Sequence, residues 1–581
     1  MSLRYLLSRL LIGLLPLAIT STVYLYLYPV FSGCAFPLPL DGGDAPNVSP
    51  PSAFLHTHHR HLAPSDQPAA DSNSKPAIFR LLVLADPQLE GDSSLPRPEN
   101  ELGARINKHW NKALDLIADA PFPFHSDVLR AVSTALRTLV LEDLPRSFVA
   151  ARKRLDLLGN DYYLAHIYRT LHWWSQPTHV TVLGDLIGSQ WVSDEEFQRR
   201  GDRYWNRVFR GGQRIDDEIT RTGEKGYPVD DEKGGEVTEK LPSSPSWAHR
   251  IINIVGNHDI GYAGDASGSR LERFERVFGR ADWDIRFQHP AVNTNGGEVT
   301  PTLHVINLNS LTLDGPPFSQ DVQGHSYTYI NDIISRRSYP VDDRSTFTLL
   351  LTHLPLHKVE GVCTDGPYFT FFDADDESDK ERYKAGGLRE QNHLSEHVSV
   401  SGVLQGIFGM SGEGNAPRGG RGRNGLILTG HDHTGCDVIH SLVSTPPPPP
   451  LLSDDEDAAA TPPEDEDKDR EHKTWTGTRY TRNSDLIENP TPSIREITLR
   501  SMMGSYGGNA GLLSLWFDVN AGEWNYAIQM CPAGVQHVWW AVHVVDLVTI
   551  IIGILYTLLS ILGSGQVTSR TVKGSQIKKT Q

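Results

Sequence analysis

Short apolar runs alternate along the chain with amphipathic stretches, and many of these runs end in Gly, Asp, Asn or His. The runs are rich in Val, Ile and Leu and have the length of buried strands. They lie at residues 78–85, 178–183, 250–255, 303–308, 347–351, 426–429, 495–499 and 512–517. Apolar residues with helical spacing lie between them, at 107–118, 126–174 and 270–279. Strands that alternate with helices predict an α/β domain.

Two longer apolar runs lie near the ends of the chain. Residues 10–28 and 538–562 are each long enough to cross a bilayer and carry aromatic residues typical of the membrane interface. We therefore expect an N-terminal and a C-terminal transmembrane helix, with a cleaved signal peptide as the alternative for the first run. Arginines before the first run and lysines after the second predict that residues 1–9 and 563–581 are cytosolic. The domain between the runs is then lumenal.

The predicted domain spans residues 78–530 and is preceded by a linker. Residues 29–77 are rich in Pro, Ser and His without a period, which is typical of a flexible lumenal linker. Within the domain, residues 211–246, 412–424 and 444–486 are Gly-rich, charged or Pro-rich and predict disordered insertions.

Composition changes this picture little. The length of 581 residues fits one large domain with insertions as well as several average domains. The formal net charge is −17, but many of the acidic residues lie in one block at 454–471, which is typical of a solvated, disordered insertion. Basic and aromatic residues are not interleaved as in a nucleic-acid groove, so we expect no nucleic-acid partner.

The cysteines give little guidance from their spacing. Cys34, Cys363, Cys436 and Cys531 form no C-x-x-C pair, so the sequence indicates neither a zinc ribbon nor a disulfide framework. Cys34 and Cys531 each lie close to one of the long apolar runs. A bridge between these two is therefore a hypothesis.

Five of the predicted strands end in residue types that bind metal ions. In chain order the strand ends are Asp86, Gly184-Asp185, Gly256-Asn257-His258-Asp259, His353 and Gly430-His431-Asp432-His433. Each one alone is explained by a polar turn, but ligands bind at strand ends in α/β sheets and the five together indicate a site. Carboxylates, imidazoles and an amide oxygen suit Mn²⁺, Fe and Zn²⁺. Two such ions sharing one Asp can clamp the attacking and leaving oxygens at phosphorus.

In this order the residues resemble the calcineurin-like metallophosphoesterases, whose pattern is D-x-H, G-D, G-N-H-[DE], H and G-H-x-H. The resemblance covers most of residues 78–520 and implies the four-layer αββα sandwich of that family. It implies two metal sites, with Asp86, Asp185 and His433 at one ion and Asp185, Asn257, His353 and His431 at the other. It also implies that His258 is the catalytic imidazole beside the phosphate and that Asp259 is its orienting partner.

Gln88 departs from this pattern. It stands where the family usually has the His of D-x-H. We expect Gln88 to complete the first metal site. An amide oxygen is a poorer donor than imidazole, so this site would favour Mn²⁺ or fill only at higher metal concentration.

Further residues narrow the resemblance to one branch of the family. The segments 256–262, 269–278, 352–356, 391–392 and 495–501 look like the branch that acts on glycosylphosphatidylinositol (GPI) anchors, whose fungal members have Asp-Pro-Gln at the first motif. This implies a Mn²⁺-dependent phosphodiesterase of the endoplasmic reticulum (ER) membrane that cycles with the early Golgi. Such an enzyme removes ethanolamine phosphate from a mannose of the anchor, and so supports export of GPI-anchored proteins to the Golgi.

The C-terminal residues and the branch together imply protein partners. Lys578 and Lys579 stand where a dilysine signal for return to the ER stands, so we expect the COPI coat as a partner. The cargo-export machinery is a further expected partner, and the substrate is a GPI glycolipid or a GPI-anchored protein.

Two other functions remain open from the sequence. The motifs belong to the chemistry, so a lumenal phosphatase or phosphodiesterase with another phosphoester substrate has the same residues. A non-catalytic export adaptor, inactive because Gln88 weakens one site, is the other alternative, and the presence of His258 speaks against it. Trp191, Tyr162 and Asp161 are candidates for the substrate cleft, although packing or capping is the simpler role for each.

Overall fold

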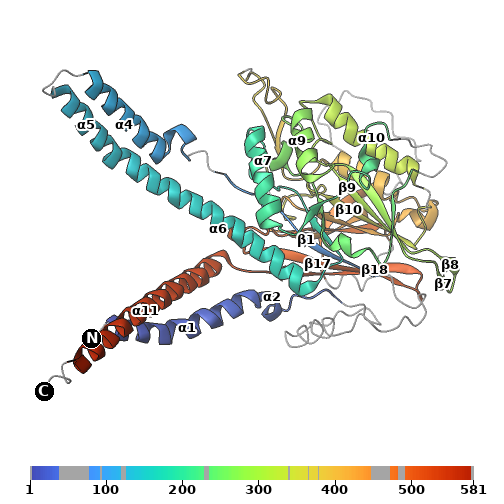
Figure 1. Ribbon diagram of the computed structural model, residues 1–581. Coiled ribbons are helices and arrows are strands. Elements are labelled where there is room, and N and C mark those ends of the chain that lie inside the picture. Colours follow the sequence, from blue (N-terminus) through green and yellow to red (C-terminus); the bar gives the residue numbers. More distant parts are fainter. Residues whose placement is uncertain are drawn as a thin grey trace, which may run out of the picture.

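The computed structural model describes most of the chain, and its centre is a pair of β-sheets (Figure 1). The described residues are 3–37, 78–91, 95–119, 126–227, 235–337, 340–363, 366–376, 378–445, 472–481 and 491–576. The first sheet has six strands in the order β18–β17–β1–β2–β5–β3, and the second has eight in the order β15–β14–β16–β13–β10–β9–β6–β4. Every strand that the sequence predicts is present, which confirms the α/β class.

The strands have the following bounds. The first sheet consists of β1 (Ile78–Leu84), β2 (His179–Val182), β3 (Gln213–Arg214), β5 (Arg250–Asn253), β17 (Asn509–Asp518) and β18 (Glu523–Pro532). The second consists of β4 (Thr238–Lys240), β6 (Trp283–Gln288), β9 (Thr302–Leu308), β10 (Thr346–Thr352), β13 (Gly425–Thr429), β14 (Cys436–Thr445), β15 (His472–Arg479) and β16 (Ser493–Thr498). Two short hairpins pair β7 (Val292–Thr294) with β8 (Gly297–Val299) and β11 (Phe369–Phe371) with β12 (Leu388–Gln391).

The central strands are apolar on both faces because both faces are covered. In β1, Leu81 and Val83 belong to the core that also contains Leu349 of β10, whereas Leu82 and Leu84 pack among helix side chains. Successive side chains of a strand point to opposite faces, so the first pair lies between the sheets and the second pair faces outward. This burial explains why the strands read as continuous apolar runs and not as alternating ones.

Helices cover the outer faces of the two sheets (Figure 1). The helices of the described residues are α1 (Leu3–Tyr26), α2 (Tyr28–Phe31), α4 (Leu102–Asp119), α5 (Ser126–Thr138), α6 (Leu144–Ser175), α7 (Asp194–Arg203), α8 (Asn257–Ile260), α9 (Gly268–Phe278), α10 (Gln320–Arg336) and α11 (Gln536–Gln576). The shorter turns are η1 (Pro98–Asn100), η2 (Leu139–Asp143), η3 (Tyr204–Val208), η4 (Arg221–Gly223), η5 (Pro245–Ala248), η6 (Val398–Ile407), η7 (Pro417–Gly420) and η10 (Gly504–Tyr506). The end of α9 is held to the first sheet by a hydrogen bond from Asn253 Nδ2 to Phe278 O, 3.2 Å. Helix α10 is held to the second by Arg336, whose Nη2 lies 3.0 Å from Asp284 Oδ1.

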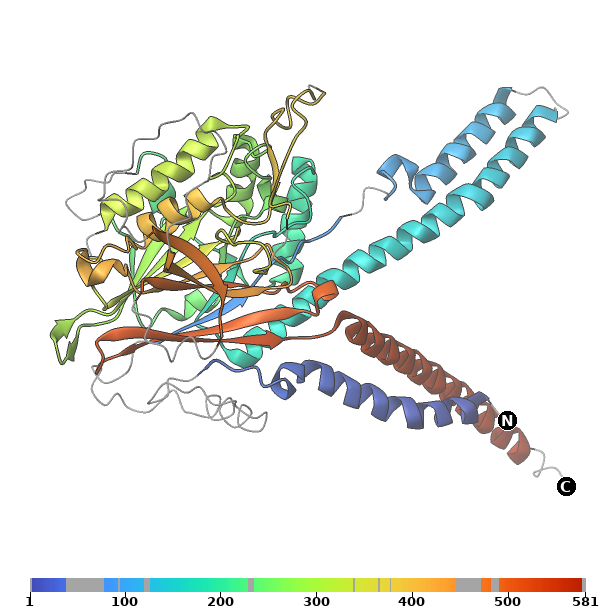
Figure 2. The same cartoon turned by 180° about the vertical axis from the view of Figure 1, so that it is seen from behind.

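The two long apolar helices lie side by side and away from the sheets (Figures 1 and 2). Both α1 and α11 are long and apolar enough to cross a membrane. The helix α1 begins before the predicted run 10–28, and α11 continues past the predicted end at residue 562. Thr22 Oγ1 donates to Asp546 Oδ2 at 2.9 Å, so the one carboxylate of the second apolar run has a partner on the first.

All four cysteines are paired in disulfides, Cys34 with Cys531 and Cys363 with Cys436. The first pair confirms the hypothesis made from the sequence and links the segment after α2 to the end of β18, just before α11. The expectation that there is no disulfide framework was wrong. Spacing along the chain could not reveal the second pair, because the segment after β10 meets the start of β14 only in the folded sheet.

Two of the segments that we expected to be disordered insertions contain strands in their described residues, and the third, 412–424, contains a short turn. The segment 211–246 contains β3 and β4, and its Thr222 Oγ1 donates to Asp284 O at 3.1 Å. The segment 412–424 contains η7, and 444–486 contains β15, which pairs antiparallel with β14. These elements were missed because strands this short, or strands this polar, have no apolar period. Residues 38–77, 446–471 and 482–490 lie outside the described part of the chain, as do Lys578 and Lys579.

A buried ion cluster fastens the segment that follows β10. Glu496 Oε1 accepts from Lys358 Nζ at 2.6 Å, and its Oε2 lies 2.7 Å from His440 Nε2 and accepts from Leu356 N at 3.1 Å. Burial alone would raise the pKa of Glu496, but the Lys358 ammonium and His440 lower it to about 2. Glu496 therefore stays ionised and depends on Lys358 for its counter-charge.

We predict that Glu496→Ala lowers the free energy of unfolding by about 3 to 5 kcal/mol, because it leaves the Lys358 ammonium buried without a counter-charge. Urea unfolding of the full chain in detergent, followed by tryptophan fluorescence, measures this. The control is Glu101→Ala, which removes a half-exposed pair with Arg154 and should cost less than about 1 kcal/mol. Equal losses in the two variants would show that the cluster is not a buried ion pair.

Candidate metal centre

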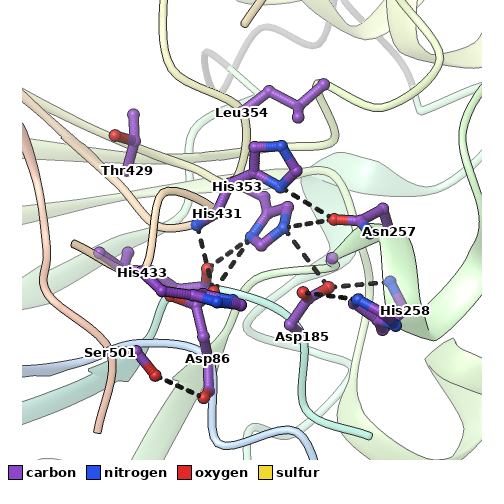
Figure 3. A network of polar contacts seen from close by, with 12 residues as sticks. Asp86, Asp185, Asn257, His258, His353, Leu354, Thr429, His431, His433 and Ser501 are labelled. Carbon is purple, nitrogen blue, oxygen red and sulfur yellow. Dashed lines mark hydrogen bonds and ion pairs between the residues drawn. The ribbon is translucent and has the colours of Figure 1, made fainter. Parts of the chain in front are cut away.

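The carboxyl ends of five strands come together at one edge of the paired sheets (Figure 3). The ladders β1–β2–β5 and β9–β10–β13 are each parallel, so their ends lie at the same edge. The first sheet brings Asp86, Asp185, Asn257 and His258 to this edge, and the second brings His353, His431 and His433. Gln88 joins them through its contacts with Asp185 and His433. The structure thus gathers every predicted metal ligand and the predicted catalytic imidazole.

Three buried or half-buried acceptor atoms point at one another in this site. Asn257 Oδ1 lies 2.9 Å from His353 Nε2 and 3.0 Å from His431 Nδ1. The other ring nitrogen of each histidine faces a carbonyl, Leu183 O at 2.8 Å and Gln391 O at 2.9 Å. A carbonyl only accepts, so these outer nitrogens carry the ring protons and the inner nitrogens present lone pairs.

Such a group of lone pairs suits a cation. Burial lowers the pKa of both histidines, that of His431 to about 3, so protonating a ring to supply a donor is unfavourable. Ligand atoms that sit about 2.1 Å from an ion and at right angles to one another are about 3 Å apart, as these are. Imidazoles whose other nitrogen donates to a carbonyl are typical metal ligands. Asn257, His353 and His431 therefore fit one divalent ion.

Asp86 and Asp185 provide the negative charge of the site. Asp86 Oδ1 accepts from His431 N at 3.1 Å, while its Oδ2 is buried and has no hydrogen-bond partner among the described residues. Burial and the charge of Asp185 raise the pKa of Asp86 well above its usual value. Two neighbouring buried carboxylates repel each other unless a cation lies between them. The bare Asp86 oxygen thus fits a metal ligand.

Asp185 lies between the two groups of ligands. Its Oδ1 is 3.4 Å from His353 Nε2 and accepts from His258 N at 2.8 Å, and its Oδ2 accepts from Gln88 Nε2 at 2.9 Å. Burial alone would raise its pKa, but the His353 and His258 imidazoles lower it overall. One oxygen faces each side, which is the arrangement of a carboxylate shared by two ions.

Gln88 and His433 lie together on the Asp86 side of the site. The amide nitrogen of Gln88 is 3.2 Å from His433 Nε2, and the His433 ring packs edge-on against Tyr506. The oxygen and nitrogen of an amide are assigned from their hydrogen bonds, and turning the Gln88 amide about would direct its oxygen at the same point. Gln88 therefore has the position of a ligand at the first metal site, together with Asp86, Asp185 and His433.

His258 and Asp259 have different surroundings although they are adjacent. The side chain of His258 is 37 % exposed, and its Nε2 is 3.8 Å from Asp185 Oδ2. Asp259 is fully buried and accepts from the backbone N–H groups of Leu186, Ile187 and Gly256 at 2.8 to 3.0 Å. The expectation that Asp259 orients the His258 ring is therefore corrected. Asp259 instead ties the loop that carries Asp185 to the turn that carries Asn257.

Several ligand residues have a left-handed backbone. Asp86, Gln88, Asp185 and His431 have φ between 40° and 73°. Non-glycine residues rarely adopt this conformation, and where they do they cluster at functional sites. Gly184 has a positive φ of 89°, and a side chain there would collide with the His353 ring. The G-D motif thus has glycine at 184 because His353, a ligand from the other sheet, lies too close for any side chain.

Two clefts open beside the ligands. The cleft beside Asn257 and His258 has a volume of about 460 Å³ and is lined by Trp191, Phe372 and Glu390. The cleft beside His431 and His433 has a volume of about 270 Å³ and is lined by Asn392, Tyr506 and other residues. The larger cleft is therefore the one that exposes His258.

Of the three residues suggested for the cleft, only Trp191 lines it. Arg270 stacks on the Trp191 ring, 4.4 Å from its centre. Asp161 is buried and binds Arg203 and Arg207 at 2.6 and 2.7 Å, and Tyr162 is exposed on α6. Sequence reasoning missed the carbonyls of Leu183 and Gln391, because a main-chain oxygen has no signature in the sequence.

Several related proteins are similar to this chain in sequence, whereas no family model matches. The chain is 33% identical to Protein TED1 of Saccharomyces cerevisiae over 425 residues, covering 68% of the chain and 77% of that protein. It is 27% identical to an uncharacterized protein of Schizosaccharomyces pombe, covering 49% of the chain and 57% of that protein. It is 24% identical to Metallophosphoesterase 1 of Danio rerio, covering 52% of the chain and 65% of that protein. The last two matches span less than two thirds of the relatives' length.

The paired sheets and the ligands at their edge define a metallophosphoesterase site. The chain belongs to the calcineurin-like metallophosphoesterases, in the branch that includes Protein TED1 and Metallophosphoesterase 1. This confirms the family that the sequence motifs indicated. The buried Asp86, Asp185 and His353 each present a ligand atom within 4.8 Å of the other two.

We predict that Gln88→His binds the first ion at a lower free metal concentration, because imidazole is the better donor. The shift should be about tenfold or more, since even outer-shell partners of metal ligands change affinity by that much. Mn²⁺ titration with metal analysis of the dialysed protein measures it. Gln88→Ala is the matched control and should shift the same step to higher concentration. Identical curves for all three proteins would mean that residue 88 is not a ligand.

Proposed function

We propose that this protein is a Mn²⁺-dependent phosphodiesterase that removes ethanolamine phosphate from a mannose of GPI anchors in the ER. In this role it supports export of GPI-anchored proteins to the Golgi. The observation that carries the proposal is the convergence of Asn257, His353 and His431 on one cation position beside the Asp185 carboxylate. The branch of the family to which the chain belongs supports the choice of substrate.

The ligand groups differ in the ion that each would hold. Asp86, Gln88, Asp185 and His433 would hold the first ion and Asp185, Asn257, His353 and His431 the second, with Mn²⁺ favoured over Fe or Zn²⁺ because oxygen donors dominate the first site. When bound, the ions would lower the pKa of a coordinated water and neutralise the phosphate. The chain's own contribution is to hold the Asp185 carboxylate between the two groups through the backbone N–H of His258.

His258 is the residue that would act on the leaving group. Its half-exposed ring lines the larger cleft, and the ligand residue that the ring approaches is Asp185. From there an imidazolium can donate its proton to the mannose oxygen as the P–O bond breaks. The cleft beside it would then hold the sugar, with Trp191 and Phe372 as flat apolar surfaces and Glu390 as a polar partner.

The membrane segments support the proposed location. Helices α1 and α11 would anchor the protein, with residues 1–9 and 563–581 cytosolic and the domain lumenal, and Lys578 and Lys579 would bind the COPI coat. The contact between Thr22 and Asp546 supports a retained α1 and not a cleaved signal peptide. The order of helices, sheet, sheet and helices supports the four-layer αββα sandwich of the family.

We predict that His258→Ala lowers turnover by about 10² to 10⁴-fold while bound metal stays unchanged, because the residue is an acid and not a ligand. The loss should shrink with 4-nitrophenyl phosphodiesters, whose leaving group needs no proton. Steady-state kinetics and metal analysis of the same samples check both statements.

Asp185→Asn is the control for the first variant. It weakens the group shared by both ions, so bound metal and turnover should fall together with either substrate. The acid role would be contradicted if His258→Ala lost bound metal, or if its activity fell equally with both substrates. If Asp185→Asn keeps full activity, the two-ion mechanism is wrong.

We predict that Trp191→Ala raises KM for a GPI glycolipid carrying ethanolamine phosphate on the order of tenfold, because it removes an aromatic contact of the sugar. Activity on a small aryl phosphodiester should not change. Mass spectrometry of the released ethanolamine phosphate measures the first reaction. Trp173→Ala, which removes an exposed tryptophan of α6, is the control and should change neither. No release from the glycolipid by the parent protein, together with hydrolysis of another phosphoester, would instead favour a phosphodiesterase of different specificity.

A further inference from the structure

The long helix α6 crosses α11 at the point where α11 begins. Asn160 Oδ1 accepts from Gln536 Nε2 at 3.2 Å, and the rings of Tyr163 and Trp539 pack edge-on at 6.3 Å. Gly159 lies so close to the Trp540 ring that a side chain there would collide with it. Because α11 is one of the two helices able to span a membrane, this crossing fixes α6 at the membrane-proximal end of the domain.

From the crossing, α6 runs outward and carries exposed apolar side chains. We call α4, α5, η2 and residues 144–158 of α6 the helical arm, which extends away from both sheets (Figures 1 and 2). Leu144, Phe148 and Leu155 of the arm are 39, 68 and 55 % exposed.

These side chains lie on the face of α6 that also contacts α11. In a helix of 3.6 residues per turn, positions 144, 148, 155, 159, 162 and 163 fall within one stripe. The stripe therefore continues the surface that packs on Trp539 and Trp540. We call Leu144, Phe148, Leu155 and Tyr162 the apolar stripe.

The other helices of the arm pack on a different face of α6. Arg105 and His109 of α4 lie 3.1 and 3.3 Å from Asp143, and Arg154 lies 2.8 Å from Glu101. Ala150, between these contacts, is buried. Helix α4 thus covers the side of α6 opposite Gly159, and nothing in the described part of the chain covers the stripe to the same degree.

We propose that the apolar stripe rests on the lumenal surface of the lipid bilayer that α11 spans. This inference rests on the membrane anchoring of the proposed function but not on its catalytic activity. Lipid is the occupant that the geometry favours, because the stripe is continuous with the start of a membrane-spanning helix and the arm leaves that helix in another direction (Figure 1). Arg152, on the same face and 84 % exposed, can lay its stem along the lipid and place its guanidinium among the phosphates.

Two contacts would then fix the domain against the membrane. The α1–α11 pair alone leaves the domain free to tilt about one point. A second contact along the arm removes that freedom, and it holds the metal centre at one height and orientation above the surface that carries a lipid-linked substrate.

The test uses the full chain in phosphatidylcholine vesicles with a fluorescent label at one new cysteine. The native cysteines are all in disulfides, so labelling is specific. Labels at Phe148→Cys and, in a second variant, Leu155→Cys should show blue-shifted emission and be quenched by nitroxide-bearing lipids. Quenching should exceed that of the matched control Arg146→Cys roughly twofold or more, because Arg146 lies on the far side of the same helix and is 73 % exposed.

A label at Leu547→Cys in α11 separates the two hypotheses. If 547 is quenched and neither 148 nor 155 is, the anchor holds and the inference about the arm is wrong. If 547 is not quenched either, the membrane anchoring itself fails. If 148 and 155 are shielded from water but not quenched by lipid, a protein surface covers the stripe, and this also overturns the proposal. Unchanged activity on an aryl phosphodiester confirms that the labelled proteins are folded.

Discussion

Three lone pairs that point at one another are the constraint on which the metal centre depends. The Asn257 oxygen and the inner nitrogens of His353 and His431 have no proton to share, because the carbonyls of Leu183 and Gln391 hold the ring protons on the outer side. A cation between them makes the arrangement favourable. Asn257 follows a strand of the first sheet and the two histidines follow strands of the second. The two sheets must therefore pack with their carboxyl ends at one edge before the site can exist.

The same constraint accounts for the strained backbone at these strand ends. A left-handed residue costs about 1 to 3 kcal/mol, and Asp86, Asp185 and His431 each adopt this conformation. The apolar core between the sheets offsets that cost. Asp259 also offsets this cost, because it accepts hydrogen bonds from three backbone N–H groups of the bent loops. The frame holds the ligands together before metal arrives, so metal binding should stabilise a fold that already exists instead of creating it.

The sequence predicted those features that depend on local pattern or on strand order. Continuous apolar runs are visible because both faces of each central strand are buried, and the ligands are visible because each one follows such a run. Features that depend on contacts between distant segments could not be predicted from the sequence. They are the Cys363–Cys436 disulfide, the short strands β3 and β4, and the polar strand β15. The role of Asp259 was mistaken for a similar reason. Adjacency in the sequence suggested His258 as its partner, but Asp259 is buried and bound to backbone N–H groups while the His258 ring is half-exposed.

The contacts around the two long apolar helices connect this centre to its proposed anchor. The Cys34–Cys531 bridge joins the exit of the first apolar helix to the entry of the second, and Thr22 gives the Asp546 carboxylate its hydrogen bond in the apolar stretch. A carboxylate within a bilayer is costly unless a partner lies beside it, so the two helices depend on each other. Cys531 ends β18, which lies beside β17 and then β1, the strand that delivers Asp86. The anchor is thus coupled through only three strands to the metal centre, and an arm resting on the same membrane would complete the orientation of that centre.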